Sequence, residues 1–171
     1  MVHRRVDVAR DRKFILDVHC ELNFVSASEV DRRVPYERYR RQWLECGQPE
    51  GFLAAVAASL DDRRTLRDVV EDADGDAVAY LWVTFVDVPG YDLVVAELND
   101  LWVAPARRRQ GIGRCLMAYV ARDAQGKGAH RLRSGSGAGN GPSLRLHENA
   151  GFAPYRVEFE QPLGARPAPG L

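Results

Sequence analysis

Gly111 and Gly113 stand one residue apart, directly after the residues RRRQ. A stretch rich in β-branched and aromatic residues precedes them, and apolar residues at helical spacing begin with Ile112, so the glycines connect a predicted strand to a predicted helix. Glycine lets consecutive backbone N–H groups converge without a Cβ in the way, and a helix N-terminus adds unpaired donors and partial positive charge. The pattern indicates an anion site, with a plain tight turn as the alternative.

Other phosphate-binding and nucleic-acid motifs fit this stretch poorly. The chain has no Gly-x-x-x-x-Gly-Lys-Ser/Thr loop. A dinucleotide fingerprint needs a third glycine where Leu116 stands and an acidic residue about twenty positions on, where the chain reads HRLRSGS. No aromatic platform accompanies the arginines, and 24 basic residues balance 24 acidic ones, so no broad positive field favours nucleic acid.

Composition fits one soluble globular domain. The chain has 171 residues, 46% hydrophobic and 28% charged, which is ordinary for that class. No apolar stretch is long enough to cross a bilayer and the start has no signal core, so we expect a cytoplasmic protein without a membrane partner. Cys20, Cys46 and Cys115 lack metal-ligand spacing. We therefore expect reduced, mostly buried thiols and no metal site.

The pattern of apolar residues predicts helices first and then strands interleaved with two later helices. We expect helices from about residue 11 to 25, over 36–46, 52–60, 111–126 and 142–149, and strands over 2–8, 65–72, 77–88, 93–103, 129–134 and 151–163. This order indicates one domain over 1–163 built on a mixed α/β sheet, followed by a frayed tail over 164–171.

Two stretches resemble the GCN5-related N-acetyltransferase family. LNDLWVAPARRRQGIGRCLM is similar to the family's signature, whose loop reads Arg/Gln-x-x-Gly-x-Gly/Ala and is filled here by Arg108, Gly111 and Gly113. NGPSLRLHENAGF resembles the second signature. The resemblance is good from about Val78 to Phe152, and earlier it rests only on the order of elements. It implies an α/β (α+β) fold whose mixed, mostly antiparallel sheet splays between the fourth and fifth strands, with helices on both faces.

The resemblance also implies a cofactor, acetyl-CoA, and the residues that hold it. The main-chain N–H groups of the loop would bind the pyrophosphate, and they belong to Arg108, Arg109, Gln110, Gly111, Ile112, Gly113 and Arg114. Pantetheine would pair with the backbone of Leu101, Trp102 and Val103. Asn140 matches an asparagine that contacts the cofactor, and a helix cap is the equal alternative. Arg107 and Arg109 are as well explained by a solvated rim as by phosphate binding.

Acetyl transfer to an amine needs a neutral amine, a stabilised carbonyl oxygen and a proton for the thiolate. A strand N–H near Leu101 or Trp102 would stabilise the oxygen. His147 stands where many family members carry a tyrosine acid, and it could donate the proton, hydrogen-bond the sulfur or only cover the helix. Some relatives have a glutamate at Asn99, so the base candidates are Glu97, which we prefer, and Asp100.

Strand alternation places Glu97 and Asn99 on one face of the sheet and Asp100 on the other, unless a bulge near Asn99 changes the phase. Asp100 could instead hold the N–H groups of a neighbouring loop. For the acceptor, we expect a pocket between the break at 26–35 and the turn DVPGYD. The acidic and aromatic residues of these loops are Glu29, Asp31, Asp87, Tyr91 and Asp92.

Three functions remain open at this point. The first is an acetyl-CoA-dependent N-acetyltransferase that acts on a small amine or a protein amine by direct attack. Because His147 and Asn99 depart from the family pattern, the second is a catalytically idle module that binds acyl-CoA or regulates. The third is a protein that binds a nucleotide or RNA through the arginines. Pairing of the terminal strand between copies would give a homodimer.

Overall fold

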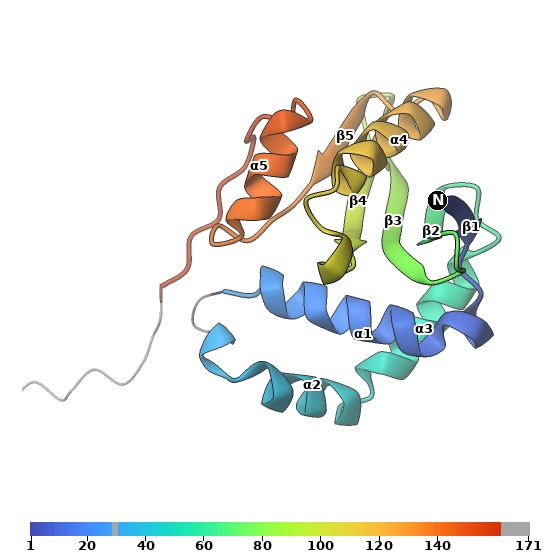
Figure 1. Cartoon of the computed structure of the whole chain (residues 1–171). Coiled ribbons are helices and arrows are strands. Elements are labelled where there is room, and N and C mark those ends of the chain that lie inside the picture. The colour runs from blue at the N-terminus through green and yellow to red at the C-terminus, as the bar shows by residue number, and fades with distance from the viewer. Residues whose placement is uncertain (29–30, 162–171) are drawn as a thin grey trace, which may run out of the picture.

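One five-stranded sheet lies between two layers of helices in the structure, a computed structural model that describes residues 1–28 and 31–161 (Figure 1). The strands are β1 (Val2–Arg5), β2 (Thr65–Glu71), β3 (Ala77–Val88), β4 (Leu93–Val103) and β5 (Arg131–Ser134). The α-helices are α1 (Val8–Ser26), α2 (Tyr36–Glu45), α3 (Gln48–Ser59), α4 (Ile112–Gly126) and α5 (Gly141–Asn149). Two 3₁₀ turns, η1 (Asp31–Arg33) and η2 (Pro105–Arg107), complete the described elements.

The sheet is mixed and splays at one edge, as the sequence predicted. Its strand order is β1-β2-β3-β4-β5; β4 and β5 are parallel and the other neighbours are antiparallel. Strand β5 pairs with β4 only over Val95–Leu98, so residues 99–103 of β4 run on without a partner on that side. The Ser134 hydroxyl, at the end of β5, donates to the Leu98 carbonyl at 3.3 Å. The backbone of 99–103 therefore forms an open edge inside the molecule.

A β-bulge in β4 sits at the start of this open edge. Asp100 pairs with Trp82 and Leu98 pairs with Val83, which leaves Asn99 as the extra residue of β4. One inserted residue reverses the side on which every later residue of the strand points. Leu98 therefore packs toward α4, while Asp100 points to the face covered by α1. Simple alternation would have placed Glu97 and Asp100 on opposite faces, and the bulge puts them on the same one.

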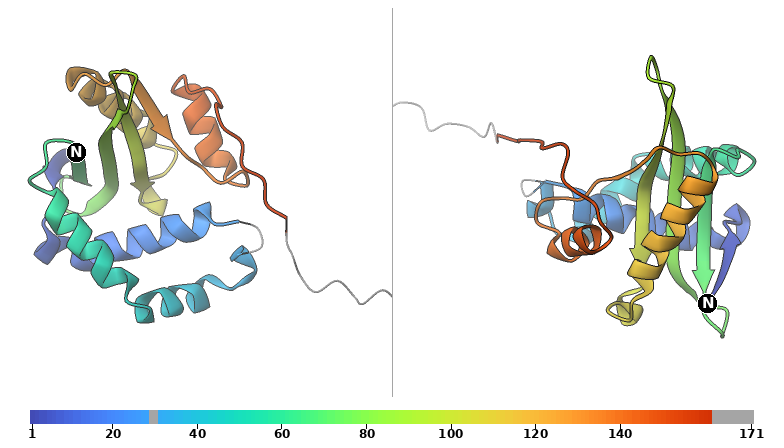
Figure 2. Two further views of the ribbon diagram at one scale, coloured as in Figure 1. Left: turned by 180° about the vertical axis from the view of Figure 1, so that it is seen from behind. Right: turned by 90° about the horizontal axis from the view of Figure 1, so that it is seen from above.

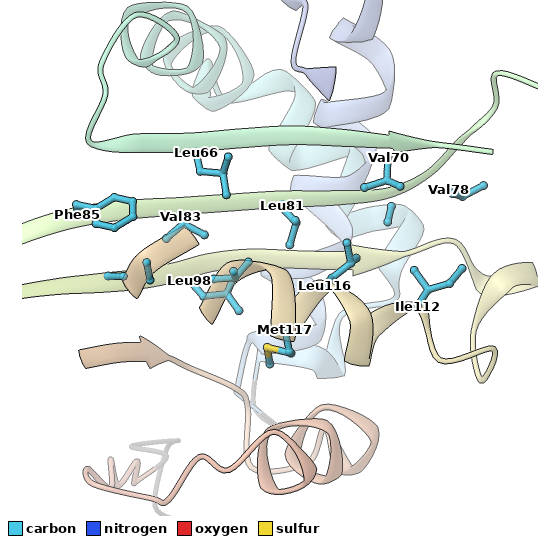
Figure 3. Packing of buried hydrophobic residues seen from close by; sticks show 14 residues of the cluster. Leu66, Val70, Val78, Leu81, Val83, Phe85, Leu98, Ile112, Leu116 and Met117 are labelled. Atoms are coloured by element: carbon cyan, nitrogen blue, oxygen red, sulfur yellow. The ribbon is translucent and has the colours of Figure 1, made fainter. Parts of the chain in front are cut away.

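Each face of the sheet has its own hydrophobic core. On one face Leu116, Met117 and Val120 of α4 pack against Leu81 and Leu98 (Figure 3). On the other face the helices α1, α2 and α3 bury Ile15, Trp43 and Val56 against Val69 and Tyr80. Figure 2 shows the same layering from two further sides. The sheet is thus covered on both faces, which fixes the strands that position the site.

Helix α1 begins one turn earlier than its apolar pattern indicated. Asp7 is the N-cap, and its Oδ1 accepts from the backbone N–H groups of Ala9 and Arg10 at 2.9 and 3.1 Å. Asp11 is buried and accepts two 2.7 Å hydrogen bonds from Arg4. Burial alone would raise the pKa of Asp11, but the Arg4 guanidinium outweighs it and the pKa is lowered.

Two expectations about the periphery were wrong, and one cannot be judged. Residues 152–161 form neither helix nor strand, so no terminal strand exists over that range. Cys46 and Cys115 are exposed. Cys115 points outward because its neighbours in α4, Leu116 and Met117, take the buried positions. The tail 164–171 lies outside the described residues. Within them, no helix combines the length and apolar content that a membrane span needs.

Candidate cofactor and catalytic site

The loop that joins β4 to α4 presents a row of unused backbone donors. Gly111 is the N-cap of α4 with φ of +83°, and Arg109 is also left-handed with φ of +63°. The first backbone bond of α4 runs from Cys115 N–H to the Gly111 carbonyl at 3.0 Å. Within the described chain, the N–H groups of residues 109–114 donate to no backbone carbonyl. A concave set of free N–H groups at a helix N-terminus fits a phosphate.

The arginines of the loop divide into anchored and free ones. Arg107 pairs with Asp72 at 2.6 Å. Arg108 donates from Nε to the Val103 carbonyl at 2.9 Å and pairs with Glu21 at 3.1 Å. Among the described residues, exposed Arg109 and Arg114 have no ion pair. Two guanidinium groups at the loop are therefore available to an anionic ligand.

Glu21 of α1 connects that helix to the end of β4. One carboxylate oxygen accepts from the Trp102 indole N–H at 3.0 Å, and the other accepts from Arg108 at 3.1 Å. A groove runs between α1 and this end of β4, with Phe14, Val18 and Trp102 among its lining residues.

The Ala104 N–H donates to the Val78 carbonyl of β3, so strand alternation turns the backbone groups of Trp102 toward β3 as well. The backbone groups that face the open side are therefore those of Leu101 and the N–H of Val103, whose carbonyl Arg108 already holds.

Gly113 has a packing role that the sequence did not show. A Cβ at this position would lie 3.2 Å from Cδ2 of Leu146 in α5. At Gly111 a Cβ would meet nothing within 4 Å, so that glycine is required by its positive φ instead. The two glycines of the motif thus serve different purposes: one turns the chain and the other admits α5.

Helix α5 carries two of the predicted site residues. Oδ1 of Asn140 accepts from the Ser143 N–H at 3.3 Å, so Asn140 caps the helix. Nδ1 of His147 donates to the Ser143 carbonyl at 2.8 Å, and its ring meets Phe152 edge-on at 5.1 Å between centroids. Nε2 of His147 is buried and has no hydrogen-bond partner in the described chain. This tautomer leaves Nε2 as an unused acceptor.

The two predicted carboxylates beside the bulge, Glu97 and Asp100, have different surroundings. The Asn99 amide donates to the Thr84 hydroxyl at 2.9 Å and to the Glu97 carbonyl at 3.1 Å, which holds the bulge in shape. Glu97 is half-buried and makes no ion pair with the described residues. Asp100 is 7% exposed and accepts from Nδ1 of His19 at 3.1 Å. Asp100 therefore pairs with a histidine of α1 rather than with the N–H groups of a loop.

Sequence reasoning missed His19, and only an apolar helix pattern surrounds it in the chain. It lies 81 residues before Asp100, so no local motif could join them. Its ring stacks on Phe52 with 3.8 Å between centroids and 6° between planes. Trp43 and Trp82 lie near the same ring, with centroids 6.2 and 6.3 Å away.

Arg67 of β2 completes the polar cluster on this face of the sheet. It is 2% exposed, its Cζ lies 3.8 Å from the Trp82 ring centroid, and it donates to the Tyr80 hydroxyl at 3.3 Å. Burial lowers the pKa of Arg67 and raises the pKa of Tyr80. Nε of Arg67 and the indole N–H of Trp82 are buried without a partner among the described residues.

The predicted acceptor pocket is not assembled as expected. The C-terminal end of α1 lies beside the loop over 135–140, since a Cβ on Gly137 would be 3.4 Å from the Ser26 carbonyl oxygen. The DVPGYD turn lies at the opposite end of β3 and β4 from Val103, and there Asp87 pairs with Arg64 at 2.6 Å. Antiparallel pairing along these long strands separates the two segments. Glu29 lies outside the described residues.

Residues 31–152 of the sequence match the Acetyltransferase (GNAT) family. The chain belongs to the GNAT family. A search of curated protein sequences finds no match. The family match spans the bulged strand, the glycine loop and α5, which are the three parts that the sequence signatures contain.

Solved structures agree with the family. A mutant of the BH1408 protein from Bacillus halodurans has a TM-score of 0.72 at 17% identity, covering 95% of this chain and 100% of that one. Glucosamine-6-phosphate N-acetyltransferase from Arabidopsis thaliana has a TM-score of 0.60 at 13% identity, covering 95% and 97%. Both likenesses show the fold.

An aminoglycoside N-acetyltransferase, AAC(6')-Iy in complex with CoA, is more similar in sequence. Its identity is 26%, its TM-score is 0.54, and the match covers 71% of this chain and 94% of that one. Family and neighbours together support acetyl transfer with acetyl-CoA as the donor.

Proposed function

We propose that the protein is an N-acetyltransferase that uses acetyl-CoA and a primary amine, with direct attack of the amine on the thioester. The observation that carries this proposal is the row of free N–H groups over 109–114 at the left-handed turn of Gly111. It lies next to the open edge of β4, so a ligand whose diphosphate sits in the loop can extend along 99–103.

The loop residues fit the diphosphate of the cofactor. Arg108, Arg109, Gln110, Gly111, Ile112, Gly113 and Arg114 would surround it, with N–H groups from 109 onward as donors and Arg109 and Arg114 as cations. Arg108 instead supports the loop through Val103 and Glu21. Asn140 caps α5, which leaves its amide N–H₂ for the cofactor. Acetyl-CoA, when bound, supplies the activated acetyl group.

Backbone donors at the open edge would stabilise the reacting carbonyl. The N–H of Leu101 follows directly on the bulge, faces the open side of β4 and can be aimed at a carbonyl oxygen without any side chain, whereas alternation turns the N–H of Trp102 toward β3. Hydrogen bonds with fixed donors gain strength in a site that excludes water. The Trp102 indole donates to Glu21, which ties this end of β4 to α1.

His147 is the candidate acid for the leaving thiolate. Its Nδ1–H is held by the Ser143 carbonyl, so the proton for the thiolate would come from Nε2 of the doubly protonated imidazolium. Because Nε2 is buried, the ring must turn or α5 must shift before it can reach a ligand. Glu97 and Asp100 are the carboxylates near the acceptor side, and Glu97 is the one without an ion-pair partner among the described residues.

The test is turnover on a panel of amines with acetyl-CoA, read as free thiol release. The proposal expects thiol release that depends on at least one small or peptide amine. Cofactor binding with no turnover on any amine would favour the idle acyl-CoA module. Two features are consistent with that alternative: Nε2 of His147 is buried, and Asn99 stands where some relatives have a glutamate. Thermal stabilisation by CoA but not by oligonucleotides would exclude the nucleic-acid alternative, since a ligand of the folded form raises its stability.

A homodimer remains a proposal. The exposed apolar side chains of Tyr155, Val157 and Phe159 offer a surface for a second copy, although they lie in an irregular segment rather than a strand. Size-exclusion chromatography with light scattering would decide the oligomeric state.

A further inference from the structure

His19 and Asp100 bring an imidazole and a carboxylate together beside the bulge of β4. Nδ1 of His19 lies 3.1 Å from Oδ2 of Asp100, and the two side chains are 16% and 8% exposed. We propose that His19 is the general base that takes a proton from the ammonium group of the acceptor, and that Asp100 is the residue that positions it. This inference rests on the proposed N-acetyltransferase function.

The hydrogen bond to Asp100 sets which nitrogen of His19 is basic. A carboxylate only accepts hydrogen bonds, so Nδ1 carries the hydrogen and Nε2 keeps its lone pair. Imidazole is the side chain whose protonation changes near neutral pH, which suits a group that must take a proton and return it to solvent. The negative charge of Asp100 also stabilises the imidazolium that forms.

Aromatic side chains hold the His19 ring in one orientation. Phe52 of α3 stacks on one side at 3.8 Å between centroids, and Trp43 and Trp82 stand farther off at tilted angles. Stacking and the hydrogen bond together restrict rotation of the ring about its side-chain bonds. A base held in this way needs no rearrangement to accept a proton.

The pair lies close to the place where the thioester carbonyl is expected. Asp100 directly precedes Leu101, the proposed donor to that carbonyl, and neighbouring strand residues are about 3.3 Å apart along the strand. The bulge at Asn99 is what turns Asp100 toward α1 and His19.

Polar atoms around the pair are incompletely satisfied. Nε of Arg67 and the indole N–H of Trp82 are buried donors without a partner in the described chain. Buried donors are normally satisfied, by water if by nothing else, so these two N–H groups can donate to a polar group of a ligand.

The charged and titratable side chains around His19 come from the strands of the sheet. Asp100 of β4 touches it, and Arg67 of β2 interacts electrostatically with Asp100 and with Tyr80 of β3. The helices α2 and α3 present the aromatic rings of Trp43 and Phe52 to it.

Acetyl transfer to an ammonium acceptor releases two protons from the nitrogen. One proton of the acceptor's ammonium group moves to Nε2 of His19, and the freed lone pair forms the C–N bond while the C–S bond breaks. The amine nitrogen gives up a second proton, which ends on the sulfur. His19 then returns its proton to solvent, so the net products are an amide, a thiol and one proton.

The test compares His19→Asn with His3→Asn. Asparagine keeps an N–H donor near the place of Nδ1 and lacks the basic nitrogen. His3 is a matched control because its Nδ1 lies 4.0 Å from the carboxylate of another buried aspartate, Asp68, at the other end of the sheet. For each variant we would measure thermal stability, CoA affinity by calorimetry, and kcat and kcat/KM for the amine as functions of pH.

We expect His19→Asn to lower kcat about 100-fold, to leave CoA affinity within about twofold, and to abolish the fall of kcat/KM at acid pH. His3→Asn should keep the activity and pH profile of the wild type. A kcat of His19→Asn within about threefold of the wild type, or an unchanged acid limb, would overturn the assignment. A shared loss of stability and CoA binding with the acid limb preserved would also overturn it, by showing a structural role.

Two further results complete the design. If His19→Asn does not fold, His19→Gln repeats the comparison with the same expected and contrary outcomes. If the wild type binds CoA but acetylates no amine, the proposed function itself fails and His19 has no reaction to serve, whereas an active wild type with an equally active His19→Asn removes only His19.

Discussion

The glycine loop and the bulge of β4 are neighbours in the chain, yet they are built in opposite ways. Over 109–114 the proposed ligand groups are backbone N–H donors, and their arrangement depends on the left-handed turn at Gly111. At the bulge the proposed chemistry depends on side chains that come from α1, β2 and β4 and meet as His19, Arg67 and Asp100.

This difference tells us where each part is sensitive to mutation. A backbone cradle tolerates side-chain changes that keep its turn and fails when the turn is lost. A side-chain cluster tolerates little change in its own residues, because each one orients another. The following substitutions separate the two kinds of site.

The largest effect is expected at the bulge, from Asp100→Asn. The change keeps size and burial but removes the charge that orients His19 and stabilises its protonated form, so we expect kcat to fall about 100-fold with CoA affinity unchanged. Steady-state kinetics and calorimetry would measure both. Equal losses in kcat and CoA affinity would show that Asp100 only supports the fold.

Asp68→Asn is the matched control for that substitution. Asp68 is 5% exposed and accepts from the Tyr119 hydroxyl at 3.1 Å, away from the bulge. Burial raises the pKa of Asp68, so its charged form costs stability at pH values above that pKa. Asp68→Asn should therefore keep the kcat of the wild type and leave the protein at least as stable at neutral pH.

The next effect is expected in the loop, from Gly111→Val. A non-glycine residue in the left-handed region costs roughly 1–2 kcal/mol, which the chain would relieve by closing or shifting the cradle. We expect CoA affinity to fall about 30-fold and kcat at saturating cofactor to change little.

Gly128→Val supplies the control, because Gly128 has φ of +77° and equally open surroundings just after the other end of α4. Both variants should lose similar stability, and only Gly111→Val should lose CoA affinity. Unaltered affinity in Gly111→Val would refute the cradle.

A smaller effect is expected from His147→Phe. Phenylalanine preserves the ring packing on Phe152 and removes both nitrogens, so we expect kcat to fall about tenfold and CoA affinity to stay within about twofold. Rapid-mixing or steady-state assays of thiol release would measure this. An unchanged kcat would remove His147 from the mechanism and leave it as part of α5.

The smallest effect is expected from Arg109→Ala. Arg109 is exposed and has no ion-pair partner in the described chain, so its attraction to a phosphate is screened by solvent and should account for about threefold in CoA affinity. The loss should shrink further at high salt. A loss as large as that of Gly111→Val would mean that the loop binds through side chains after all.

The sequence predicted the fold of the glycine loop and of the splayed strands, but not the side-chain cluster at the bulge. Gly111, the helix behind it and the splay of the sheet follow from local spacing and from the family signature. The bulge at Asn99 was anticipated only as a possibility, because one extra residue leaves no mark in a strand's composition. His19 could not be found, since its partner is 81 residues away and its own helix shows only an apolar pattern.

Errors at the periphery have similar causes. Tyr155, Val157 and Phe159 alternate with charged residues as a strand would, but alternation does not provide a neighbouring strand to pair with. Cys115 was expected inside because its neighbours are apolar, and helical geometry placed Leu116 and Met117 there instead. The sequence indicated an anion site or a tight turn at Gly113, and the contact of this residue with Leu146 depends on how α5 packs against α4.

Backbone amide NMR during a titration with CoA tests the central claim most directly. If the N–H groups of 109–114 hold the diphosphate and the open edge of β4 receives the pantetheine, the largest shifts will fall on those amides and on the amides of Leu101 and Val103. Saturation with CoA that leaves these amides unchanged and perturbs another part of the chain would contradict the claim.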